Sequence, residues 1–167
     1  TYSEYKDLVR SSDFIIIDKN IKDLFPFELF ERQSIFIVES NEKNKNLKTV
    51  TNLLNKLIED QISKGSNVTA IGGGVIQDIA ACSCALFRRG QPFVYIPSTT
   101  LGQLDSCVGA KCAINTEKAK NILGLFSAPK EVIIPTFMIN TMKLAEHRAG
   151  LSEMLRLCLT ASNDALV

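Results

Sequence analysis

The feature that most constrains this chain is a run of three glycines, Gly72–Gly74, between a predicted strand and a predicted helix. The strand is the short apolar segment Val68–Ile71, and the helix is the segment of mostly small, apolar residues Val75–Phe87. Glycines at such a junction let the backbone approach a phosphate closely, and the first N–H groups of the helix then face the anion. The pattern therefore indicates a nucleotide-binding loop, although a glycine cluster alone is also compatible with a plain tight turn.

The rest of the chain alternates predicted strands with predicted helices. Apolar residues at helical spacing run between Asn46 and Lys64, where Gly65 is placed to end the helix, and a last helix is predicted for about 145–159. This order predicts an α/β fold with a Rossmann-like parallel sheet flanked by helices, in which ligands bind at the carboxyl ends of the strands. The other predicted strands are Phe14–Asp18, Ser34–Val38, Phe93–Ile96 and Val132–Ile134, the last stopped by Pro135.

Composition narrows the class of protein. A length of 167 residues and a hydrophobic share of 46% are typical of one globular domain with its own core. A formal net charge of +1 gives no electrostatic reason to expect nucleic acid or a membrane surface as a partner. No apolar run approaches the roughly 20 residues of a membrane span. The five cysteines are odd in number and lack Cys-x-x-Cys spacing, so we expect buried, reduced thiols in a cytoplasmic protein.

Polar side chains stand where a parallel sheet binds its ligand. Asp18 closes the first predicted strand, and Asp78 lies in the first turns of the helix after the glycines. Ser98 and Thr99 directly follow another strand. Each of these residues could instead cap a helix, so none of them identifies a site by itself.

A second group of polar residues lies among small or apolar neighbours. Asp105 and Lys111 are six residues apart, and Lys120 and Asn121 precede the apolar segment 122–126. Lysines in such surroundings are expected to lie away from the surface. Several lysines that converge on one site suit a phosphorylated, hydroxylated substrate. Ordinary solvated lysines are the alternative.

The last predicted helix carries a carboxylate and a cation on one face. Glu153 and Arg156 are three residues apart, beside an apolar stripe of Leu151, Leu155 and Leu159. The helix alone favours an ordinary surface ion pair. The functional interpretation is a metal ligand beside a substrate-binding cation.

A set of landmarks extends along nearly the whole chain. They are Asp18–Asn20, Glu42–Leu47, Gly72–Val75, Asp78, Phe87–Gly90, Pro97–Thr99, Asp105–Ser106, Gly109, Lys111, Asn115, Lys120–Asn121, Gly124, Phe126, Pro129 and Gly150–Glu153. In this order, and with family-like spacing from Gly72 to Glu153, they resemble 3-dehydroquinate synthase and the wider sugar phosphate cyclase family.

The resemblance implies an NAD- and metal-dependent carbon–oxygen lyase of the shikimate pathway, which supplies aromatic amino acid biosynthesis. In this chemistry a hydroxyl of a phosphorylated seven-carbon sugar acid is transiently oxidised at NAD+, and phosphate leaves by β-elimination. The hydride is then returned, the ring opens, and an aldol step closes a carbocycle. The metal, zinc or cobalt, acts as a Lewis acid.

The resemblance also implies roles for individual residues. Lys111, Glu153 and Arg156 are expected to be catalytic, with Glu153 as the metal ligand. Arg89 is similar to an arginine that reaches the substrate of a partner subunit, which implies a homodimer. The other expected substrate contacts are Asp105, Lys111, Asn121 and Arg156, and the expected NAD contacts are Asp18, Asn20, Glu42, Lys45, Gly73, Gly74, Val75, Asp78, Ser98, Thr99, Lys120 and Thr141.

Family members are about twice as long, with two histidine metal ligands in a helical C-terminal domain. His147 precedes the Glu153 motif and matches neither ligand. We therefore expect residues 1–144 to form the NAD-binding domain of a dehydroquinate synthase-like two-domain fold. Residues 145–167 would begin the helical metal- and substrate-binding domain, so the chain alone is expected to bind NAD weakly and to show no turnover.

Departures from the family pattern leave other functions open. Gln77, Ala110 and Ala119 replace glycines, and Arg156 replaces a lysine, so a sibling cyclase acting on another heptulose phosphate is one alternative. A metal-dependent polyol dehydrogenase is a second, but such enzymes resemble one another in having an aspartate where Glu153 stands. A non-catalytic NAD-binding module is a third, although such a module would need neither Lys111 nor Glu153.

Overall fold

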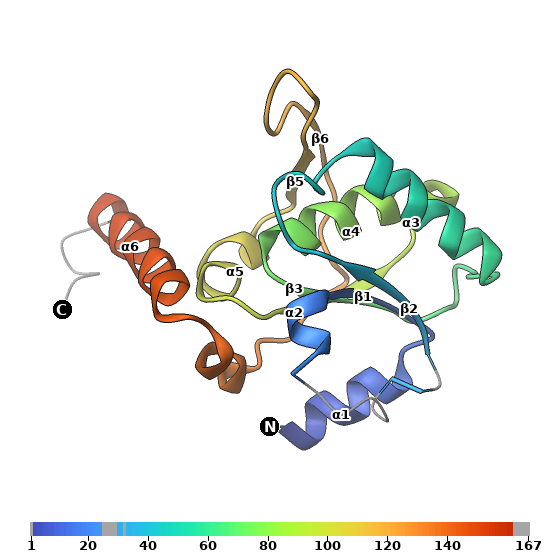
Figure 1. Cartoon of the computed structure of the whole chain (residues 1–167), viewed down its shortest axis with the longest axis horizontal. Coiled ribbons are helices and arrows are strands. Elements are labelled where there is room, and N and C mark those ends of the chain that lie inside the picture. Colours follow the sequence, from blue (N-terminus) through green and yellow to red (C-terminus); the bar gives the residue numbers. More distant parts are fainter. Residues whose placement is uncertain (1, 25–29, 32, 162–167) are drawn as a thin grey trace.

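A computed structural model describes residues 2–24, 30–31 and 33–161 (Figure 1). Its centre is a five-stranded parallel sheet in the order β2-β1-β3-β4-β7. This arrangement confirms the predicted α/β fold with a parallel sheet. The strands are β1 (Phe14–Asp18), β2 (Ser34–Val38), β3 (Val68–Gly72), β4 (Phe93–Pro97) and β7 (Glu131–Val132).

The order of the strands places a topological switch point between β1 and β3. The chain leaves β1 for β2 on one side of it and returns to β3 on the other side. Ile17 pairs with Ile71, so Asp18 and Gly72 end neighbouring strands at the same edge. Ligands of open parallel sheets bind at this edge, where the strand order reverses.

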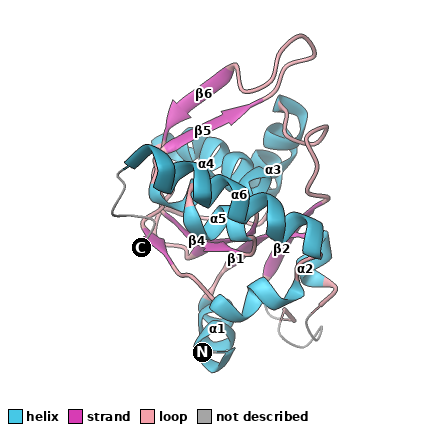
Figure 2. Ribbon diagram, turned by 90° about the vertical axis from the view of Figure 1, so that its left-hand side faces the viewer, coloured by secondary structure: helices cyan, strands magenta, loops and turns pink. Residues whose placement is uncertain are grey.

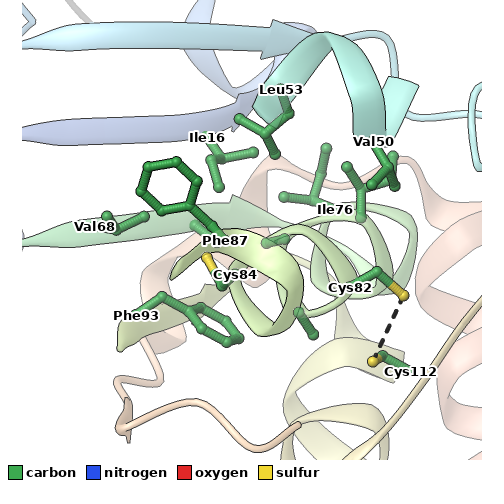
Figure 3. Close-up of a cluster of buried hydrophobic side chains, with 14 of the residues drawn as sticks. Ile16, Val50, Leu53, Val68, Ile76, Cys82, Cys84, Phe87, Phe93 and Cys112 are labelled. Carbon is green, nitrogen blue, oxygen red and sulfur yellow. Dashed lines mark hydrogen bonds between the residues drawn. The ribbon is translucent and has the colours of Figure 1, made fainter. Parts of the chain in front are cut away.

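Alternate residues of the central strands face two separate cores. Phe14 and Ile16 of β1 pack with α3 (Leu47–Glu59) and α4 (Gly74–Leu86), as Figure 3 shows for Ile16. Ile15 and Ile17 pack on the opposite face, where α1 (Tyr2–Ser11) contributes Tyr5 and Val9. Both faces are covered, which explains why β1 and β3 are fully buried and read as continuous apolar runs.

A hairpin and a long helix extend from this body (Figures 1 and 2). The antiparallel hairpin β5 (Lys111–Ile114) and β6 (Leu123–Phe126) packs on α4 through β5. Helix α6 (Leu144–Ala161) packs on α5 (Thr100–Leu104), where Gly150 permits close approach. None of the described helices is long and apolar enough to cross a membrane. The short helices are α2 (Lys19–Lys22), η2 (Phe87–Arg89), η3 (Ser106–Val108) and η4 (Thr136–Thr141).

Two predicted boundaries were wrong. Helix α3 ends at Glu59 rather than near Gly65, because Asp60 caps it and Gln61 takes a left-handed φ of 56°. Strand β7 ends at Val132, although the N–H of Ile133 still donates to Tyr95 O. The last helix, α6, lies where it was predicted.

The predicted apolar stripe of α6 is not buried: Leu151, Leu155 and Leu159 are 38%, 52% and 62% exposed.

The expectation for the cysteines is confirmed in that all five are free and four are buried.

Candidate nucleotide and substrate site

The glycine corner between β3 and α4 is closely packed. Gly73 is extended (φ −84°, ψ −167°), and no described side chain caps α4, which leaves the first N–H groups of this 13-residue helix open to an anion. Ser98 N donates to Gly72 O at 3.0 Å. A Cβ on Gly73 would lie 2.9 Å from Thr99 Cγ2, closer than such carbons approach. The corner therefore requires glycine at this position.

Polar residues surround the corner. Asp18 is buried and accepts hydrogen bonds from Asn20 N at 2.9 Å and Asn20 Nδ2 at 3.2 Å. Burial raises the pKa of Asp18, and these hydrogen bonds only partly offset that effect. Thr99 caps α5 by accepting from Gly102 N at 3.0 Å. The capping alternative is therefore correct for both side chains, which does not prevent either of them from facing a ligand.

Ser98 supplies the clearest sign that the corner is built for a polar ligand. Its hydroxyl is buried and has no hydrogen-bond partner within the described part of the chain. An unpaired buried hydroxyl costs about 1–3 kcal/mol. Native proteins rarely leave such a group unsatisfied unless a ligand, ion or water completes it. The residues at the corner thus fit a bound dinucleotide.

The second part of the site is a buried lysine that two segments distant from it in sequence hold in place. Lys45 is 5% exposed, and its Nζ donates to Asp78 Oδ2 at 2.9 Å and to Asn121 Oδ1 at 2.6 Å. Glu42 Oε1 lies 3.8 Å from the same nitrogen. The ammonium is therefore paired on several sides, which is the condition under which a lysine is buried.

Asn115 connects these segments. Its Nδ2 donates to Glu42 Oε2 at 2.9 Å, and its Oδ1 accepts from Asn121 N at 2.9 Å. Asn121 takes a left-handed φ of 53°, and Asp78 Oδ1 accepts from Ala113 N at 3.1 Å. Sequence reasoning named Asn115 as a landmark but missed its role in the site. Beside the network lies a cavity of about 880 Å³, lined by Glu42, Lys43, Asn46, Leu47, Lys48 and residues 115–120.

The structure does not withdraw the predicted lysines from solvent. Lys111 and Lys120 are both exposed, contrary to the expectation from their apolar neighbours. Strand β5 alternates its faces, so Lys111 points outward while Cys112 is buried. The buried lysine is instead Lys45, from a segment whose composition is that of a solvated loop.

Glu153 and Arg156 form an exposed ion pair. Arg156 Nε donates to Glu153 Oε1 at 2.9 Å and to Oε2 at 3.0 Å. This hydrogen bonding lowers the pKa of Glu153 and is also the main cause of a raised pKa at Arg156, to which Asp105 adds a smaller electrostatic effect. Asp105, exposed at the end of α5, therefore lies near the pair.

Thr141 and Arg89 make no hydrogen bond to the Lys45 network among the contacts of the described residues. Thr141 donates its hydroxyl to Met138 O at 2.7 Å, and Arg89 is exposed with a left-handed φ of 62°. His147 Nδ1 lies 2.7 Å from Thr100 Oγ1. Among the residues described, no three His, Cys, Asp or Glu side chains are grouped to bind a metal. Glu153 alone does not make a metal site.

The parallel sheet with helices on both faces, and the glycine corner at its switch point, define an α/β domain of the dehydroquinate synthase-like fold. Residues 35–149 match the family described as 3-dehydroquinate synthase N-terminal. The chain belongs to the 3-dehydroquinate synthase family.

Similar curated proteins agree with this assignment. The 3-dehydroquinate synthase of Thermoanaerobacter pseudethanolicus is 40% identical over 159 residues, which are 90% of this chain and 45% of that protein. That of Helicobacter pylori is 34% identical over 156 residues, 90% of this chain and 46% of that protein. The chain therefore spans about half the length of the curated relatives it matches.

Solved structures of sugar phosphate cyclases share the fold. A 2-epi-5-epi-valiolone synthase from Streptomyces hygroscopicus, with NAD+ and Zn2+ bound, is 28% identical, with a TM-score of 0.80 over 86% of this chain and 42% of that one. A 2-deoxy-scyllo-inosose synthase with carbaglucose-6-phosphate, NAD+ and Co2+ is 26% identical, with a TM-score of 0.81 over 93% of this chain and 46% of that one. An iron-containing alcohol dehydrogenase from Corynebacterium glutamicum, 14% identical at a TM-score of 0.66, covers 87% of this chain and 40% of that one and shares the fold alone.

Proposed function

We propose that this chain provides the NAD-binding part of a 3-dehydroquinate synthase. Such an enzyme converts a phosphorylated seven-carbon sugar acid to a carbocycle with loss of phosphate. The observation that carries the proposal is the Lys45 network, in which Asp78 and Asn121 meet beside the glycine corner. Family membership supports assigning this geometry to cyclase chemistry.

The corner has the features needed to hold the dinucleotide. The open N-terminus of α4 would face its diphosphate, and the unpaired Ser98 hydroxyl would gain a partner. Glu42 lines the cavity beside the Lys45 network, where its carboxylate can accept hydrogen bonds from hydroxyl groups. When bound, NAD supplies a hydride acceptor that later returns the hydride. The other proposed contacts are Asp18, Asn20, Lys45, Gly73, Gly74, Val75, Asp78, Thr99, Lys120 and Thr141.

Asn121 is the best-positioned substrate contact. Lys45 donates to the Oδ1 of this side chain, and a lysine has no acceptor, so the orientation of the carboxamide is fixed. Its Nδ2 is left as a donor toward an anionic oxygen. A donor held in place contributes to binding without losing further side-chain freedom. Asp105, Lys111 and Arg156 are the further proposed contacts.

We also propose a two-domain enzyme, divided near residue 144, that acts as a cytoplasmic homodimer. Exposed Arg89 would reach the partner's substrate, and its left-handed backbone supports a specialised role because such strain concentrates at functional sites. Glu153 is the proposed ligand of a zinc or cobalt ion, for which the described residues supply no complete donor set. Both carboxylate oxygens of Glu153 accept from Arg156 here, so a bound metal would compete with this ion pair.

A chimera tests the function. This chain would replace the matching half of the Thermoanaerobacter pseudethanolicus enzyme, and phosphate release would be followed with NAD+, zinc and the phosphorylated seven-carbon sugar acid. We expect activity that Asn121→Ala lowers at least tenfold and that the exposed-residue control Asn52→Ala leaves unchanged. A folded, NAD-binding chimera without activity would refute the proposal. Multiple turnovers by the 167-residue chain alone would instead refute the division into two domains.

A sibling cyclase is the second candidate. Gln77, one of the departures from the family pattern, is buried and donates to Ser106 O at 2.6 Å, close to the glycine corner. Arg156 presents a planar guanidinium where the family usually has a lysine ammonium. The two groups bind oxyanions with different geometry, so this replacement changes which oxyanion of a substrate is held. Assaying the chimera with a panel of heptulose phosphates separates the candidates, because the preferred substrate releases phosphate fastest.

A further inference from the structure

Two buried cysteines from different elements lie close together near the Lys45 network. Cys82 of α4 and Cys112 of β5 point toward each other, with 3.7 Å between their sulfur atoms (Figure 3). Both are only 3% exposed. Cys84, two residues further along α4, is buried too but has no hydrogen bond to another thiol in the described structure. The neighbouring thiols are therefore a specific pair rather than a general accumulation of cysteine in the core.

We propose that Cys82 and Cys112 form a redox-active dithiol, which hydrogen peroxide converts to a disulfide that ties α4 to the β5–β6 hairpin. The inference is independent of the proposed cyclase activity.

The geometry requires only a small adjustment. A disulfide needs a sulfur–sulfur distance of about 2.05 Å, so the two atoms must approach by about 1.7 Å from their present 3.7 Å. Cys112 belongs to a two-stranded hairpin whose second strand, β6, is mostly exposed. Strand β5 pairs with one strand, β6, whereas β1, β3 and β4 each pair on both sides, so fewer backbone hydrogen bonds hold β5 in place. Such a movement would also have to admit peroxide, because both sulfur atoms are buried.

The two thiols differ in reactivity. The pKa of Cys112 is lowered chiefly because its sulfur accepts the hydrogen bond from the Cys82 thiol. That hydrogen bond, followed by burial, raises the pKa of Cys82. Since the thiolate is the nucleophile, Cys112 is the thiol that attacks peroxide.

The reaction balances in two steps. The Cys112 thiolate attacks one peroxide oxygen, an S–O bond forms as the O–O bond breaks, and the departing hydroxide takes up a proton to become water. The Cys82 sulfur then attacks the Cys112 sulfur, so that an S–S bond forms and the S–O bond breaks. The second hydroxide leaves with the proton from Cys82 as another water. The protein loses two protons and two electrons, which together equal two hydrogen atoms.

The crosslink would fix one wall of the candidate site. Cys112 precedes Ala113, whose N–H donates to Asp78, and Asp78 lies one turn before Cys82 on α4. A disulfide would therefore hold the hairpin against the helix that carries the partner of Lys45.

Peptide mapping tests the proposal on the 167-residue chain, which is treated with hydrogen peroxide, alkylated and digested without reductant. We expect a peptide pair linked through Cys82 and Cys112, lighter by two hydrogen atoms and separated by dithiothreitol. The melting temperature of the oxidised chain should rise on the order of 5 °C, because the crosslink restricts the unfolded chain.

Matched variants sharpen the outcome. Cys112→Ala should abolish the linked peptide, whereas Cys84→Ala, at another buried cysteine of α4, should retain it. Cys158→Ala removes the partly exposed thiol and should also retain the link. The wild-type map does not depend on the folding of any variant. If peroxide gives no Cys82–Cys112 link there, or links either residue to Cys84 or Cys158 instead, the proposal is wrong.

Discussion

Replacing Lys45 by methionine tests whether the buried ammonium holds the candidate site together. Methionine keeps most of the volume, so the main change is the loss of the contacts at 2.9 Å to Asp78 and 2.6 Å to Asn121. Removing one partner of a buried ion pair costs about 3–5 kcal/mol. The Asp78 side chain is 21% exposed and keeps its hydrogen bond from Ala113, so we expect a loss of about 2–3 kcal/mol.

Denaturant unfolding at neutral pH, followed by circular dichroism, measures this loss. Lys48→Met is the matched control, because Lys48 lines the same cavity but is exposed; its effect should stay within about 0.5 kcal/mol. Asp78→Asn should cost less in the Lys45→Met background than in the wild type, since the carboxylate has already lost its cation. If Lys45→Met unfolds at the wild-type midpoint, or the two substitutions are additive, Lys45 does not organise the site.

Three further perturbations test other parts of the structure. A Cβ on Gly150 would lie 2.6 Å from Thr100 Cβ, so Gly150→Ala should undock α6 from α5 at a cost of about 1–3 kcal/mol; retained amide protection in α5 would contradict this. Burial raises the pKa of Asp18 above its ordinary 3.8, so the folded state binds more protons and wild-type stability falls as the pH rises from 3.8 through the raised value. Asp18→Asn should remove that slope and be the more stable form at pH 7 in denaturant titrations, and an unchanged slope would exclude Asp18 as its source. Asn46 caps α3 by accepting from Thr49 N at 3.0 Å, so Asn46→Ala should cost about 1 kcal/mol of unfolding free energy, whereas an unchanged denaturation midpoint would show that the cap contributes nothing.

The sheet could be predicted because its signal is local. Four strands lie in short apolar runs, and the three glycines mark the turn from β3 into α4. The end of α3 could not be found in the same way, since Gly65 is a conventional stop signal but the backbone already turns at Gln61. A strand was predicted at Val132–Ile134, but the bounds of β7 are set by its pairing with β4, which the sequence does not show.

The site was predictable in outline only. Asp18, Asp78, Ser98 and Thr99 do lie at strand ends or helix starts, as expected. The burial of Lys45 could not be read from the polar residues around it, because its partner Asn121 is 76 positions away. The hairpin that brings them together was not anticipated, and the roles assigned to individual residues stay predictions.

The wide sequence separation between Lys45 and its partners determines how late in folding the cavity wall is completed. The two hydrogen-bond partners of Lys45 lie 33 and 76 residues further along the chain, so a nascent chain lacks the last of them until Asn121 has been synthesised. Contacts of such wide separation also form late in refolding, because the intervening loops must close first. The cavity wall should therefore be completed at the end of folding, after the first three strands have paired.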